Sequence, residues 1–63
     1  MRWELYEVWA EEDGLEELVD TTKSLNEARE IANKAIDNGA EYAIIYRETD
    51  DGDLAIVEEV AAE

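Results

Sequence analysis

The chain has 63 residues, of which 19 are Asp or Glu and 5 are Lys or Arg, for a formal net charge of −14. This length allows one domain at most, with about 60% of the unfolded surface buried on folding, and it leaves little room for a deep catalytic cleft. The lack of Cys and His removes disulfides, thiolate metal sites and the usual general base, while the acidity opposes binding to nucleic acid or anionic membranes.

The apolar content argues that the chain folds despite its charge. Hydrophobic residues make up 46% of the sequence, with two Trp and three Tyr and no Pro. Disordered chains of high net charge have low apolar content. No basic-then-apolar leader opens the chain, and no apolar run approaches the ~20 residues needed to span a bilayer. We therefore expect residues 1–63 to form a single acidic domain, soluble and cytoplasmic.

The first part of the chain predicts a β-hairpin. Residues Arg2–Glu12 are rich in aromatic and β-branched side chains, and Leu15–Thr22 predicts the returning strand. Between them stands Asp13-Gly14, a strong signal for a type I′ turn, since both central positions of that turn need a positive φ.

A helix is predicted from about Leu25 to Asn38. Ser24 is a good N-cap, and Glu27 three residues later completes a capping box. Gly39 is a good C′ residue, which ends the helix. An apolar stripe at helical spacing would face the sheet, and its three alanines would allow a close approach. The stripe consists of Leu25, Ala28, Ile31, Ala32, Ala35 and Ile36.

A second hairpin follows the helix. Glu41–Thr49 predicts a strand with Tyr-Ala-Ile-Ile-Tyr at its centre, and Leu54–Ala61 predicts its partner. The polar loop Asp50–Asp53 between them is expected to be a type I′ turn. The predicted fold class is therefore α+β in the order ββαββ, a four-stranded and mainly antiparallel sheet with one helix packed on one face.

A two-residue turn at Asp13-Gly14 sets the expected pairing in the first hairpin. One face would pair Glu12 with Leu15, Ala10 with Glu17, Val8 with Val19 and Tyr6 with Thr21. The other face would pair Trp9 with Leu18, Glu7 with Asp20 and Glu11 with Glu16. Like charges directly opposite each other destabilise a sheet, so we assign the second face to solvent or to a partner.

On this interpretation the helix covers the side of Tyr6, Val8 and Val19. The open side then carries Trp3, Leu5, Trp9 and Leu18. The alternative is a register shifted by one residue, which would put the tryptophans in the core.

Either side of the second hairpin could lie under the helix. One side offers Tyr42, Ile44, Tyr46 and Val57, and the other offers Ile45, Leu54, Ile56 and Val60. Two partly apolar sheet faces and a single helix indicate a partner, or a weak homodimer, on the open face.

Catalysis and metal binding are poorly supported by the sequence. Ser24 is the only serine and is explained as an N-cap. Around Gly52, Asp51 and Glu58 fit the EF-hand pattern, but Arg47 stands where the first aspartate belongs. We therefore expect no enzymatic activity, no catalytic residue, no metal site and no cofactor.

The acidic residues themselves are the candidate site. They gather at the two hairpins, and a net charge of −14 exceeds what a small domain needs for solubility. A strongly negative surface favours basic partners, and carboxylates at i and i+2 of a strand lie about 7 Å apart on one face, so that an acidic sheet could stand in for a phosphate backbone. The expected partner-binding residues are Glu7, Trp9, Glu11, Glu12, Asp13, Glu16, Glu17, Asp20, Asp50, Asp51 and Asp53, with Trp9 or Trp3 as an aromatic anchor.

In size, in its lack of cysteine and in its Glu/Asp runs, the chain resembles the small acidic phage proteins that mimic DNA, among them restriction inhibitors and anti-CRISPR proteins. The resemblance covers the whole chain in composition and involves no diagnostic motif. It implies an inhibitor in the host-cell cytoplasm that occupies the DNA-binding surface of a basic nucleic-acid-binding protein or effector complex.

Two other interpretations remain open at this point. One is a salt-adapted acidic domain, which the scarcity of lysine favours and the excess of Glu over Asp does not. The other is a designed or orphan protein-interaction module, which the regular capping and turn signals would suit.

Overall fold

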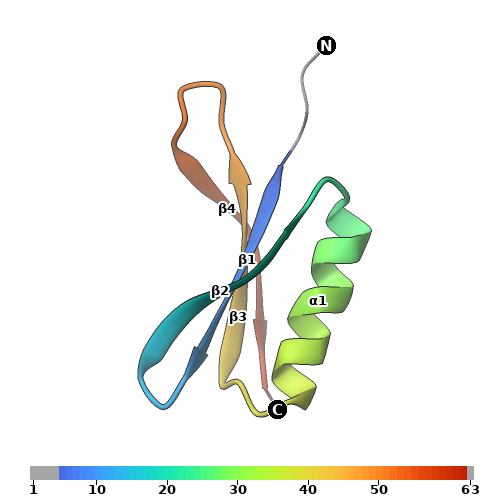
Figure 1. Cartoon of the computed structure of the whole chain (residues 1–63), viewed down its shortest axis with the longest axis vertical. Helices are drawn as coiled ribbons and strands as arrows, with labels where there is room; N and C mark the ends of the chain where they lie inside the picture. Colours follow the sequence, from blue (N-terminus) through green and yellow to red (C-terminus); the bar gives the residue numbers. More distant parts are fainter. Residues whose placement is uncertain (1–4, 63) are drawn as a thin grey trace.

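The computed structural model describes residues 5–62 and contains one sheet and one helix (Figure 1). The elements are β1 (Tyr6–Glu12), β2 (Leu15–Thr22), α1 (Leu25–Asp37), β3 (Tyr42–Glu48) and β4 (Leu54–Ala61). The sheet is antiparallel with strand order β2-β1-β3-β4, and α1 packs across one side of it. The predicted α+β fold is confirmed, and every predicted boundary among these residues agrees to within one position. The predicted start of the first strand and Trp3 lie outside the described residues.

The core lies between α1 and the two central strands. Val8 of β1 and Ile45 of β3 are fully buried, and so are Ala28 and Ala32 on the facing side of α1. Alanine at these helix positions lets the helix backbone approach the sheet closely, as the sequence predicts. The rest of the predicted apolar stripe is partly buried against this core.

The helix begins at Ser24, where one of the two hydrogen bonds of the predicted capping box is formed and the other is replaced. The Glu27 N–H donates to the Ser24 hydroxyl at 3.3 Å. The carboxylate of Glu27 does not return to the Ser24 N–H; it accepts from the hydroxyl of Thr22 at 2.9 Å, and Thr22 Oγ1 in turn accepts from that N–H at 3.3 Å. Thr22 therefore links the end of β2 to the first turn of the helix.

The helix ends in a Schellman motif at Gly39, where the sequence predicts the stop. Gly39 has a φ of +113°, which a residue with a Cβ rarely adopts. Its N–H donates to the carbonyl of Ile36, and the N–H of Ala40 donates to that of Ala35, each at 3.0 Å. These bonds satisfy the last carbonyls and turn the chain towards β3.

The two hairpin loops differ in geometry. Asp13 and Gly14 have φ values of +54° and +81°, which confirms the predicted type I′ turn. The loop at Asp50–Asp53 is not a type I′ turn, because Gly52 is its only residue with a positive φ. Thr49 organises this wider loop: its N–H donates to the Asp53 carbonyl at 2.8 Å, and its hydroxyl accepts from the Asp53 N–H at 3.2 Å.

A β-bulge at Val19 divides the first hairpin into two registers. Near the turn the pairs are the predicted ones, up to Trp9 with Leu18. Beyond it Val8 pairs with Asp20, so Val19 is an extra residue without a partner on β1. The predicted pairs of Val8 with Val19, Tyr6 with Thr21 and Glu7 with Asp20 are therefore wrong; Tyr6 faces Thr22 and Glu7 faces Thr21.

A second bulge, at Val57, decides the faces of the second hairpin. Ile45 pairs with Glu58 and Tyr46 with Ile56, which leaves Val57 as the extra residue. Glu58 lies on the helix side, since its carboxylate forms an ion pair with Arg29 of α1 at 3.1 Å. The predicted grouping of Ile45, Leu54, Ile56 and Val60 on one side is therefore wrong. Ile45 and Val60 lie on the helix side, whereas Ile56 and Leu54 lie on the same side as Tyr46.

Candidate partner-binding face

The helix covers one side of the sheet, and the other side is open. Tyr6 and Val8 lie in the core under α1, as predicted for the first hairpin. Trp9 therefore points the other way, because successive side chains of a strand alternate between faces. Its partner Leu18 stands next to the bulge and also borders the groove beside α1. We define the open face by three rows of residues across β2, β1, β3 and β4. They are Glu16, Glu11, Tyr42 and Ala61; Leu18, Trp9, Ile44 and Glu59; and Thr21, Glu7, Tyr46 and Ile56.

The centre of the open face is a small apolar cluster. Ile44 is only 7% exposed although α1 packs on the opposite side of the sheet. Trp9 is its partner across the strands, and Tyr42 and Tyr46 flank it along β3. The side chains of these three neighbours are half-buried. The open face thus carries three aromatic side chains at neighbouring register positions of β1 and β3.

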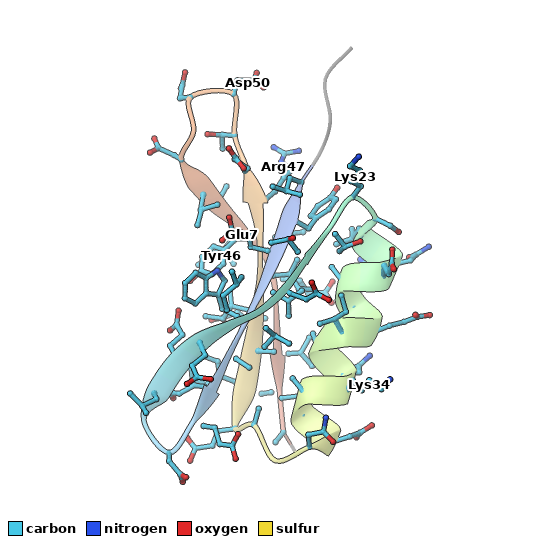
Figure 2. All side chains as sticks on the ribbon, in the orientation of Figure 1. Glu7, Lys23, Lys34, Tyr46, Arg47 and Asp50 are labelled. Atoms are coloured by element: carbon cyan, nitrogen blue, oxygen red, sulfur yellow. The ribbon has the colours of Figure 1, made fainter. Side chains whose placement is uncertain are left out.

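Glu7 joins two of these aromatic side chains. The indole N–H of Trp9 donates to Oε1 of Glu7 at 3.0 Å. Glu7 is also the direct partner of Tyr46 across β1 and β3. Figure 2 shows Tyr46 on the side of the sheet away from α1. The hydrogen bond fixes the orientation of the Trp9 ring beside a carboxylate.

Glu11 and Tyr42 form a second pair of carboxylate and aromatic ring. They are direct partners across β1 and β3. Partial burial, the negative charge of Glu11 and a side-chain hydrogen bond with Glu11 together raise the pKa of the Tyr42 hydroxyl. Glu16 faces Glu11 from β2, so one of the two predicted acid pairs is present. Its negative charge also contributes to the raised pKa of Tyr42.

Charge is distributed unevenly between the two sides of the sheet. Within residues 5–62 the open face carries no Lys or Arg. Arg29 lies on α1. Figure 2 shows Lys34 on the same helix and Lys23 in the loop that precedes it. Arg47 pairs with Tyr6 and so belongs to the helix side. Every charged residue from Leu5 to Thr22 is acidic.

Other predicted site residues lie around a groove on the helix side. The β1–β2 turn and the C-terminal end of α1 enclose an open groove of about 430 Å³. Leu15 and Val19, which are 66% and 45% exposed, contribute its apolar surface. Glu12, Asp13 and Glu17 also line it. Asp20 pairs with Val8, so it too lies on the helix side and not beside Glu7.

The remaining predicted residues are at the other end of the sheet. Asp50, Asp51 and Asp53 lie in the loop after β3, which Figure 1 shows at the opposite end of the molecule from the β1–β2 turn. The longest dimension of the molecule is 37 Å. The structure therefore brings Glu7, Trp9, Glu11 and Glu16 together on the open face and separates them from this loop.

Sequence reasoning missed the contribution of β3 and β4 to this face. The missed residues are Tyr42, Ile44, Tyr46, Ile56 and Glu59. The alternation Tyr-x-Ile-x-Tyr signals one face of a strand, but β3 becomes the neighbour of β1 only through the crossover of α1. The pairing of Glu7 with Tyr46 and of Glu11 with Tyr42 was thus not readable from the sequence.

Comparison with models of known protein families, with curated proteins and with solved structures gives no match to the chain. Among residues 5–62, no three acidic side chains are grouped so that they could hold a metal ion. Over the same residues, no helix has the length and apolar character needed to cross a membrane.

Proposed function

We propose that the protein is a non-enzymatic inhibitor that docks its open face on the basic, nucleic-acid-binding surface of another protein, in the manner of DNA-mimic and anti-CRISPR inhibitors. One observation carries the proposal: among the described residues, the open face combines carboxylates with an aromatic surface and contains no basic side chain. A face of this kind attracts a cationic surface and repels phosphates.

The positions of the carboxylates suit a substitute for phosphates. Glu7 and Glu11 stand four residues apart on β1, which corresponds to about 13 Å along a strand. The major groove of B-DNA, which phosphates border on both sides, is about 12 Å wide. Trp9 lies between the two glutamates and offers apolar contact area of the kind that dominates binding energy at protein interfaces.

The pairing of Glu11 with Glu16 supports a binding role over a purely structural one. Directly opposed like charges cost a sheet stability. No Lys or Arg within residues 5–62 forms an ion pair with either carboxylate. A basic partner would relieve this repulsion, so the same residues that weaken the free protein would strengthen the complex.

Capture from a host lysate at low salt, with DNA as competitor, tests the proposal. The protein is immobilised, bound proteins are eluted by rising salt or by a DNA duplex, and the two eluates are compared. We expect the same bound protein in both eluates, because protein and DNA would compete for one basic surface, and we expect elution at moderate salt.

A matched pair of double variants locates the surface. Glu16→Lys with Glu59→Lys changes the open face by four charge units and is expected to abolish capture. Glu17→Lys with Asp37→Lys makes the same change on the helix side and should leave capture nearly intact. Equal losses in both variants, or no displacement by DNA, would contradict the proposal. A protein that unfolds below about 1 M salt would support salt adaptation in its place.

A further inference from the structure

We propose that the open face selects arginine over lysine, so that the partner surface it fits is arginine-rich. This inference depends on the proposed function, which requires a cationic partner, and it specifies the chemistry of the cation. Its basis is the repeated placement of an aromatic ring beside a carboxylate on the same face.

Three such pairs occur on β1 and β3. The Trp9 indole is held by a 3.0 Å hydrogen bond to Glu7. Tyr46 faces the same Glu7 directly across the strands. Tyr42 faces Glu11 directly across the same two strands. Each pair offers a ring surface and an acceptor group side by side.

A guanidinium group fits this arrangement better than an ammonium group does. Guanidinium is planar and weakly hydrated, so it stacks on an aromatic ring while its N–H groups bind a carboxylate in the same plane. A carboxylate has about four acceptor positions, so Glu7 can bind a guanidinium while it still accepts from Trp9. The lysine ammonium is compact and strongly hydrated, and it gains less from the ring.

A second copy of the protein is a poor occupant of the open face. Docking two open faces would bring Glu7, Glu11, Glu16 and Glu59 close to the same carboxylates of the other copy. No basic side chain among the described residues of that face would compensate. Charge complementarity therefore assigns the apolar surface around Ile44 to a cationic partner.

Octa-arginine and octa-lysine peptides of equal charge provide the test, by calorimetric titration of the full chain in about 150 mM salt. We expect octa-arginine to bind about fivefold more tightly, as one or two ring contacts would provide. The ratio should fall towards one in Trp9→Leu and, separately, in Tyr46→Leu. Val19→Ala, a change of an exposed apolar residue on the other side of the sheet, should leave the ratio unchanged. Circular dichroism verifies folding of each variant, and either ring variant suffices if the other does not fold.

The outcomes separate this inference from the proposed function. Equal affinity for both peptides would overturn arginine selectivity and leave a charge-driven docking face. Absence of binding to either peptide, even at low salt, would overturn both. A stable dimer in sedimentation that is lost in Tyr46→Leu would assign the open face to a second copy and also overturn the inference.

Discussion

Replacing Glu16 by lysine should stabilise the free protein while it weakens partner binding. Glu16 lies directly opposite Glu11 on the open face, and both strands end at the Asp13-Gly14 turn. The substitution converts the only predicted acid pair that the structure retains into a pair of opposite charges. Stability and binding would then change in opposite directions at one residue.

The expected gain follows from the separation of the two strands. Two unit charges about 5.5 Å apart in water interact by about 0.75 kcal/mol, and physiological salt screens roughly half of this. Turning repulsion into attraction doubles the effect, which gives a gain of about 0.7 kcal/mol, within the range measured for cross-strand pairs. In a domain of this size the gain corresponds to an increase in Tm of about 4 °C.

Thermal unfolding followed by circular dichroism, in low and in high salt, measures this effect. Glu17→Lys is the matched control, because it removes the same charge from the neighbouring position, where the partner across the strands is Ala10. We expect the control to gain less than half as much, and the advantage of Glu16→Lys to disappear in about 1 M salt, where the Debye length is about 3 Å. Equal gains in both variants, or a gain that persists in high salt, would refute the reasoning.

Three further outcomes are expected. The raised pKa of the Tyr42 hydroxyl means that the folded state holds this proton more tightly than the unfolded state does. The free energy of unfolding should therefore fall as the pH rises above about 10. Urea unfolding at alkaline pH should show a smaller loss in Tyr42→Phe. Ala32→Leu should lower the free energy of unfolding by about 1–3 kcal/mol, because it overpacks the fully buried contact between α1 and the sheet. Asn33→Leu, on the exposed side of α1, should change it by no more than about 0.5 kcal/mol. The denaturant midpoints of the two variants measure the difference. Gly14→Ala should lower the Tm, because the φ of +81° strains a residue with a Cβ, although nothing lies within 4 Å of the added atom.

Local signals in the sequence were sufficient for the elements and their ends. The Asp13-Gly14 turn, the Ser24 cap and the Gly39 stop each depend on the conformation of a few neighbouring residues, and each is found where the sequence predicts it. The apolar stripe of α1 likewise follows from helical spacing alone.

The faces of the strands were less accessible, because a bulge changes them without a local signal strong enough to predict it. Val19 and Val57 each insert one residue, and each shifts the pairing of the rest of its strand. The bulge at Val19 removed the expected contact of Glu7 with Asp20. The bulge at Val57 moved Ile56 to the open face.

The arrangement of the candidate site was predictable in part. The position of Trp9 on the open face and the pairing of Glu11 with Glu16 follow from the type I′ turn, since these residues lie between the turn and the first bulge. The partnership of β1 with β3 depends on the crossover through α1, a long-range feature that no local pattern encodes. For that reason the sequence did not predict that Tyr42 and Tyr46 belong to the candidate site.

The most direct test of a cationic docking role for the open face is a map of backbone amide chemical shifts during titration with octa-arginine in about 150 mM salt. We expect the largest changes at Trp9, Glu11, Ile44 and Tyr46, with small changes along the exposed side of α1. Changes of similar size at acidic residues throughout the molecule, with the Asp50–Asp53 loop and α1 affected as strongly as the open face, would contradict the account.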